Sequence, residues 1–201
     1  MSRNIIAILR GITPPEAAEI CAVLVAEGIT HIEVPLNSPD PFASIAAMVA
    51  VAPAGVVIGA GTVLTVQDVA NVQAAGGTLI VSPNADVEVI KATKTAGMLS
   101  YPGVLTPTEC FAAIHAGADG LKIFPSSVIG TSGLAAYKAV LPKDMPVYAV
   151  GGAGPDNFAD WIAAGAAGFG IGTGIYKSGF SAQDVRDRAR AIVTAYDQAT
   201  A

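Results

Sequence analysis

The sequence alternates eight times between a short β-rich run and an alanine-rich stretch with helical spacing, and this alternation limits the fold more than any other feature. The short runs cover residues 5–9, 30–35, 56–59, 78–82, 98–101, 120–124, 147–150 and 168–171. The helical stretches cover residues 14–27, 41–51, 66–75, 87–96, 107–116, 134–140, 155–164 and 182–199. Eight βα units of this length close into a parallel barrel more readily than they form an open sheet. We therefore predict one α/β domain over residues 1–201, a (β/α)8 TIM barrel, with a doubly wound sheet as the structural alternative.

Glycine and proline mark the ends of the predicted helices. A glycine follows five of the alanine-rich stretches, where a left-handed backbone costs least: Gly28, Gly76, Gly97, Gly117 and Gly165. Three helix starts carry a capping residue before proline: Thr13-Pro14, Thr106-Pro107 and Gly154-Pro155.

Bulk composition excludes several classes of protein. Glycine, proline and charged residues interrupt every apolar run before about 18 residues, so we expect no membrane span. Residues 1–4 lack the features of a signal peptide and lead into a strand-like run, which favours the cytoplasm. A net charge of −5 argues against a nucleic-acid partner, and the charged fraction of 13% is typical of a subunit that hides surface in an oligomer. Cys21 and Cys110, far apart in helical patterns, are expected to be reduced.

Two charged residues interrupt strands that should otherwise be apolar. Period-two alternation puts Lys122 on the opposite face from Leu121 and Ile123, and therefore inside the barrel if those two face the helices. A desolvated lysine has a lowered pKa, which favours the amine that attacks a carbonyl. Glu33 interrupts the second strand in the same way, where it is either an ion-pair partner or a proton carrier.

Other candidates lie at the ends of strands, where barrels of this type bind substrates. Arg10 ends the first strand and suits carboxylate or phosphate, unless it pairs with an acidic neighbour. Thr62 places a hydroxyl after the third strand. Gly151-Gly152 and Gly172-Thr173 follow the seventh and eighth predicted strands, where backbone amides commonly hold phosphate.

Metal and dinucleotide sites lack support in the sequence. The two histidines, His31 and His115, are isolated from any cluster with metal-ligand spacing, and we assign His31 a structural role. No glycine-rich dinucleotide fingerprint opens a helix, so we expect neither a metal nor an organic cofactor.

Five segments, in order along nearly the whole chain, resemble the 2-keto-3-deoxy-phosphogluconate/phosphogalactonate aldolase family. They are residues 8–14 (ILRGITP), 32–39 (IEVPLNSP), 58–64 (IGAGTVL), 122–127 (KIFPSS) and 149–152 (AVGG). The resemblance implies a homotrimeric barrel that binds a phosphorylated keto-acid substrate and uses no cofactor. Its Schiff-base lysine corresponds to Lys122 and its acid/base glutamate to Glu33.

The resemblance also implies the residues that bind substrate. They are Arg10, Thr62, the substrate-orienting Pro83, and the phosphate ligands Gly151, Gly152, Gly172 and Thr173. Asn37, where phosphogluconate enzymes carry arginine, resembles the phosphogalactonate branch, whose substrate yields pyruvate and glyceraldehyde 3-phosphate in galactonate breakdown. Ala153 and Gly174 depart from the commoner family pattern beside the phosphate ligands.

Three alternatives remain open from the sequence. The first is a phosphogluconate or 4-hydroxy-2-ketoglutarate aldolase with the same imine chemistry. The second is a phosphosugar isomerase or synthase that keeps the phosphate site without an imine. The third is a noncatalytic barrel that senses a phosphorylated metabolite.

Overall fold

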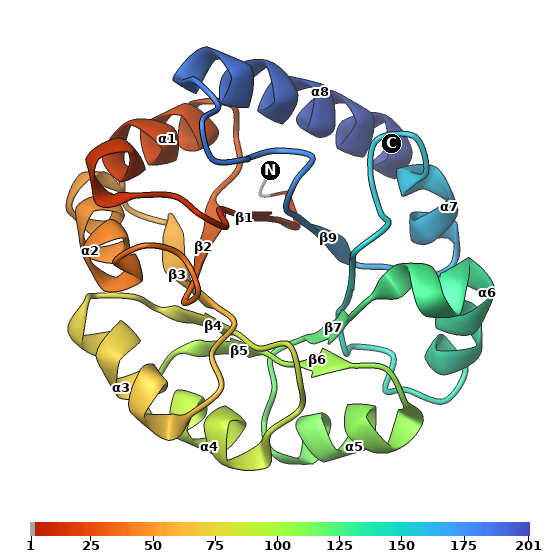
Figure 1. Ribbon diagram of the computed structural model, residues 1–201. Coiled ribbons are helices and arrows are strands. Elements are labelled where there is room, and N and C mark those ends of the chain that lie inside the picture. The colour runs from red at the N-terminus through yellow and green to blue at the C-terminus, as the bar shows by residue number, and fades with distance from the viewer. Residues whose placement is uncertain (1–2) are drawn as a thin grey trace.

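A computed structural model describes residues 3–201 and contains a barrel of parallel strands surrounded by eight helices (Figure 1). The strands are β1 (Ile5–Ile8), β2 (His31–Pro35), β3 (Val57–Gly61), β4 (Leu79–Val81), β5 (Leu99–Tyr101), β6 (Gly103–Val104), β7 (Leu121–Ile123), β8 (Val147–Val150) and β9 (Gly168–Ile171). The helices are α1 (Pro14–Ala26), α2 (Pro41–Val51), α3 (Val66–Ala74), α4 (Val87–Thr95), α5 (Pro107–His115), α6 (Ser126–Lys138), α7 (Phe158–Ala163) and α8 (Ala182–Thr200). The predicted (β/α)8 TIM barrel is confirmed, and the doubly wound alternative is wrong.

The fifth predicted strand, residues 98–101, corresponds to β5 alone, and after Pro102 the chain forms a second short strand, β6, that was not predicted. β5 pairs with β4, and β6 pairs with β7, so the two pieces together form one position in the barrel wall. Proline has no N–H to donate to a neighbouring strand, which accounts for the break. The carbonyl of Pro102 still accepts a 2.9 Å hydrogen bond from the Lys122 amide, which keeps β7 attached across the division.

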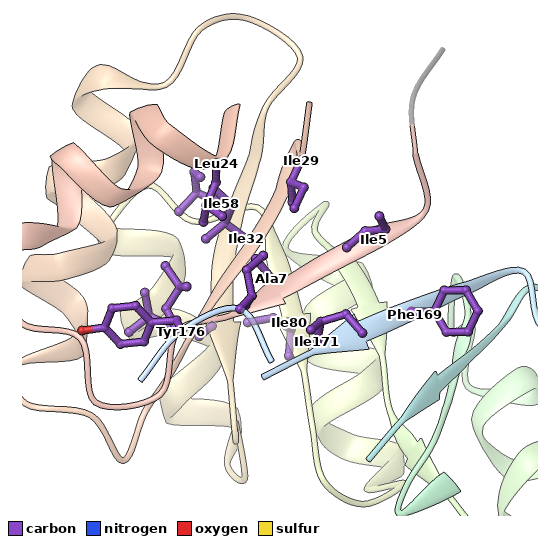
Figure 2. Packing of buried hydrophobic residues seen from close by; sticks show 14 of the residues in the cluster. Ile5, Ala7, Leu24, Ile29, Ile32, Ile58, Ile80, Phe169, Ile171 and Tyr176 are labelled. Carbon is purple, nitrogen blue, oxygen red and sulfur yellow. The ribbon is translucent and has the colours of Figure 1, made fainter. Parts of the chain in front are cut away.

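Alternate strand residues form two layers of packing. Ile5 and Ala7 of β1, Ile32 of β2 and Phe169 of β9 point outward into the main core beneath the helices (Figure 2). The intervening positions face the barrel interior, where Ile6, Leu79, Val81, Tyr101 and Tyr148 make a second apolar cluster. This interior cluster and the strand alternation place Glu33 and Lys122 within the barrel.

Most of the predicted helix boundaries agree with the structure within one or two residues. The five glycines that follow helices all have positive φ angles, between 73° and 100°, as expected. Thr13 and Thr106 cap α1 and α5. Cys21 and Cys110 are buried free thiols, in agreement with their predicted reduced state.

Two helix starts were predicted wrongly. α6 begins at Ser126 rather than at residue 134, and Gly130 makes a non-helical kink within it at φ 64°. α7 begins at Phe158 rather than at Pro155, because Asn157 holds the preceding turn: its side chain accepts from the Gly154 amide and donates to the Gly152 carbonyl, both at 2.9 Å. Within residues 3–201, no helix is both long and apolar enough to cross a bilayer.

Candidate active site

Lys122 projects from β7 into the barrel. Its neighbours Leu121 and Ile123 are fully buried on the helix-facing side, and the Lys122 side chain occupies the opposite side with 8% of the residue exposed. The Lys122 ammonium lies 4.6 Å from the ring centroid of Phe124, two residues along the same face. Burial lowers the pKa of Lys122 from its ordinary value; the carboxyl of Glu33 opposes this shift and the charge of Arg10 adds to it.

Glu33 projects from β2 into the same interior and is 2% exposed. Its Oε2 atom is buried and has no hydrogen-bond partner among residues 3–201. Burial raises the pKa of Glu33 to about 7, although the positive charges of Lys122 and Arg10 act in the opposite direction. No direct ion pair joins Glu33 to Lys122 in the described part of the chain. The Glu33 carboxyl therefore shares the barrel interior with the Lys122 amine without forming a salt bridge to it.

Gly61, at the end of β3, provides the space that the Glu33 carboxyl occupies. A Cβ atom at Gly61 would lie 1.8 Å from Glu33 Oε2, far inside contact distance. The sequence analysis did not identify this role. The pairing that brings β2 beside β3 creates the requirement for glycine at this position.

A cavity of about 430 Å³ opens at the carboxyl ends of β1, β8 and β9. Among its lining residues are Arg10, Gly151, Gly152, Gly172 and Thr173, all of them predicted from the sequence, and none of the residues that line it is acidic. This combination of glycine backbone, hydroxyl groups and two cations, Arg10 and Lys177, is suited to a phosphate group.

The loop after β8 is fixed by hydrogen bonds to the first turn of α6. The Gly151 carbonyl accepts from the Ser127 amide at 2.9 Å and from Ser126 Oγ at 2.8 Å. Gly151 and Gly152 have φ angles of 84° and 103°, which residues with a Cβ rarely adopt. The peptide planes of the glycine pair are therefore set before any ligand arrives.

The remaining predicted site residues surround this centre at different positions. Thr62 follows β3 with φ at 57°, and Pro83 follows β4; both are half-buried and neither lines the 430 Å³ cavity. Lys122 and Glu33 do not line it either, and both side chains are buried in the barrel interior. Phe124 connects the two regions, since its ring contacts the Lys122 amine and also lines the cavity.

Among the described residues, His31, the cysteines and the acidic side chains other than Glu33 do not add to this site. His31 is half-buried at the start of β2, away from the carboxyl ends of the strands, and burial lowers its pKa. Within residues 3–201, no three His, Cys, Asp or Glu side chains gather closely enough to hold a metal ion.

Known proteins are similar to this chain in both sequence and fold. A profile of the family described as "Aldolase: KDPG and KHG aldolase" matches residues 2–191. A protein of Rhizobium meliloti (strain 1021), named "Probable 2-dehydro-3-deoxy-6-phosphogalactonate aldolase", is 54% identical over 98% of this chain and 93% of its own length. The "2-dehydro-3-deoxy-6-phosphogalactonate aldolase" of Escherichia coli (strain K12) is 47% identical over 97% of this chain and 95% of its own. A solved structure described as "Native KDPGal structure" superimposes with a TM-score of 0.97 at 46% identity, covering 100% of this chain and 97% of that one.

Proposed function

This chain belongs to the KDPG and KHG aldolase family, and from that premise we propose that it is a class I aldolase for 2-dehydro-3-deoxy-6-phosphogalactonate. The reaction is reversible cleavage to pyruvate and glyceraldehyde 3-phosphate. The observation that carries the proposal is a buried lysine, with a lowered pKa, that shares the barrel interior with a buried carboxyl and contacts Phe124, which lines the glycine-rich cavity.

Lys122 is the proposed nucleophile. Its neutral amine adds to the C2 ketone, and loss of water from the carbinolamine gives an iminium ion. The iminium accepts the electron pair released when the C3–C4 bond breaks, which leaves an enamine of pyruvate on Lys122. Protonation of the enamine carbon and hydrolysis of the resulting iminium release pyruvate and restore the amine.

Glu33 is the proposed acid and base. Formation of the carbinolamine and loss of water each move a proton, and C3–C4 cleavage requires removal of the proton on the C4 hydroxyl. A carboxyl with a pKa of about 7 can give and accept protons near neutral pH. The unpartnered Oε2 is the atom available for this transfer.

The glycine-lined cavity is the proposed phosphate site. Gly151, Gly152, Gly172 and Thr173 present backbone and hydroxyl donors there, and Arg10 supplies a positive charge. Ala153 and Gly174, which depart from the commoner family pattern, also line the cavity, but contacts through backbone amides tolerate changes of side chain.

Two further residues are proposed to hold the keto-acid end of the substrate. Thr62 and Pro83 follow β3 and β4 at the carboxyl face of the barrel, on the Glu33 side of the interior. Thr62 would donate a hydrogen bond to the substrate, and Pro83 would orient it by contact. Both roles rest on the family resemblance together with this placement.

Borohydride trapping tests the imine. Reduction in the presence of pyruvate should leave a stable adduct, found by peptide mass spectrometry on the fragment that contains Lys122. Lys122→Arg should abolish both the adduct and cleavage, whereas the control Lys91→Arg, on the exposed face of α4, should keep both. An adduct on another lysine, or cleavage at the normal rate by Lys122→Arg, would refute the proposal.

A comparison of the two C4 epimers tests the choice of substrate. The proposal requires a higher kcat/KM for the phosphogalactonate substrate than for its phosphogluconate epimer. The opposite preference would make the enzyme a phosphogluconate aldolase with the same imine chemistry.

We also propose that the protein is a cytoplasmic homotrimer. Large apolar side chains, including Val128 (66% exposed) and Val140 (60% exposed), lie uncovered on the surface of one chain, and burial of such surface favours association. Light scattering should give a mass three times that of one chain, and the mass of a single chain would contradict the trimer.

A further inference from the structure

Arg10 is attached to the neighbouring loop by its side chain. It lies in the loop between β1 and α1, and its Nη1 atom donates a hydrogen bond to Oδ1 of Asn37, in the loop between β2 and α2. A second contact joins the same two loops one residue further along, where the Gly11 amide donates to Oγ of the buried Ser38 at 2.9 Å. Two adjacent contacts therefore fix the Arg10 loop against the loop that follows β2, the strand that carries Glu33.

The chemistry of the acceptor matters for what Arg10 can do. No ion pair involves Arg10 within residues 3–201. The amide oxygen of Asn37 orients the guanidinium without neutralising it. Because Arg10 also lines the cavity that contains no acidic side chain, its full charge remains available to an anion there.

We propose that Asn37 is a positioning residue that holds the Arg10 guanidinium toward the phosphate of the substrate and selects for phosphorylated substrates through it. The inference rests on the proposed function. The role of Asn37 is indirect: its side chain contacts Arg10, and Arg10 in turn contacts the substrate.

Two substitutions separate orientation from charge. Asn37→Ala removes the acceptor and frees the guanidinium to adopt other rotamers, so the KM for glyceraldehyde 3-phosphate in the addition to pyruvate should rise about fivefold. Asn37→Asp keeps the size but places a carboxylate on Arg10, which competes with the phosphate, so this KM should rise by about tenfold or more. In both variants kcat should change much less than KM, because the reacting carbons are not touched.

The substrate without phosphate provides the first control. The KM for unphosphorylated glyceraldehyde should be nearly the same in the wild type and in both variants, because no anion engages Arg10. Asn71→Asp on α3 adds the same negative charge outside the cavity and should leave the KM for both aldehydes near that of the wild type.

A double-mutant cycle with Arg10→Ala is the decisive test. If Asn37 acts through Arg10, substitution of Asn37 has no further effect on the KM for glyceraldehyde 3-phosphate once Arg10 is alanine. A full, additive effect in that background would overturn the inference, because Asn37 would then act on the substrate by another route. A loss in kcat with an unchanged KM would overturn it as well.

Borohydride trapping with pyruvate alone separates this inference from the proposed function. The Lys122 adduct should form in every Asn37 variant, since pyruvate carries no phosphate. If the adduct forms but the KM for glyceraldehyde 3-phosphate does not respond to Asn37, only the positioning role fails. If no adduct forms even in the wild type, the proposed imine chemistry fails first.

Discussion

Burial acts on Lys122 and Glu33 in complementary directions. The barrel interior disfavours charge on both, so it lowers the pKa of the amine and raises that of the carboxyl, while their mutual attraction opposes both shifts. Burial is the larger effect for each group. The interior therefore favours the neutral form of the amine beside a carboxyl that exchanges protons near pH 7, as the proposed imine chemistry requires.

The raised pKa of Glu33 predicts the pH dependence of cleavage. The carboxylate must be free of its proton to accept one from the C4 hydroxyl, so kcat/KM for cleavage should fall as the pH drops below about 7, the pKa of Glu33. Glu33→Gln should lower kcat by about 10²- to 10⁴-fold and remove this acidic limb from the residual activity. Steady-state rates between pH 5 and 9 measure both effects. An unchanged acidic limb in Glu33→Gln would assign it to another group.

Gly61 offers a second prediction at the scale of one residue. Gly61→Ala places a methyl group where the Glu33 carboxyl lies, so it should destabilise the fold by roughly 1–3 kcal/mol and lower kcat as the carboxyl is displaced. In a Glu33→Ala background the added methyl has room, and the stability cost should shrink to within about 0.5 kcal/mol. Urea unfolding measures all four proteins. An equal cost in both backgrounds would mean that the methyl group clashes with something other than Glu33.

The sequence indicated the proposed site residues that interrupt a pattern and missed the contacts of those whose proposed role depends on a neighbour. Lys122 and Glu33 are detectable because each is a charge within an apolar strand. Gly61 and Phe124 look ordinary in the sequence, and Asn37 is distinguished only by the family resemblance, which says nothing of its contact with Arg10. Their roles arise from pairing between strands or from contact between loops, which a single sequence does not specify.

At the scale of elements, the repeated βα pattern predicted the fold, and its errors occur where side chains outside the repeat decide a boundary. Pro102 ends β5, and the chain resumes as β6 because Gly103 and Val104 pair with β7. α6 begins eight residues earlier than expected. Its first turn, residues 126–129, carries two serines, a valine and an isoleucine rather than the alanine-rich pattern, and contacts to the loop after β8 hold it.

The cap of α5 gives a prediction at this scale. Thr106 Oγ1 accepts from the Glu109 amide, and the Glu109 carboxylate accepts from the amides of Leu105 and Thr106. Thr106→Ala should lower the free energy of unfolding by about 1 kcal/mol, because it leaves a helix-terminal N–H without its partner. Thr108→Ala, also exposed and in the first turn of the same helix, should change it by less than about 0.5 kcal/mol. Equal losses in chemical denaturation would show that the cap contributes nothing.

At the scale of the whole molecule, the first and last parts of the chain close the ring of helices. α8 packs between α7 and α1 (Figure 1). Arg3 donates to the Asp197 carboxylate on α8 at 2.6 and 2.7 Å. Glu27, at the end of α1, accepts hydrogen bonds from Arg186 and Arg190 of α8. Because these pairs join residues more than 150 positions apart, they act on closure of the barrel rather than on any one βα unit.

Substitution of Glu27 tests how much the contacts that close the barrel depend on charge. Its side chain is only 12% exposed, and the hydrogen bond from Arg190 lowers its pKa further than the burial raises it. A carboxyl whose pKa is lowered by folding stabilises the folded state above its unfolded pKa, and that contribution is lost as the pH falls through the folded pKa. Glu27→Gln should therefore lower the free energy of unfolding at pH 7 by roughly 0.5–1 kcal/mol, a modest value because both arginines remain partly in solvent.

The matched control for Glu27 is Glu19→Gln, which removes the same charge from an exposed position on the same helix and should cost less than about 0.3 kcal/mol. The difference between the two variants should disappear as the pH falls through the lowered pKa of Glu27, where its carboxyl gains a proton, and should shrink in high salt, which screens the two arginines. Urea denaturation at pH 7 and at successively lower pH, with and without added salt, measures these changes. If the cost of Glu27→Gln is the same under every condition, packing of the Glu27 side chain rather than its charge joins the two ends of the barrel.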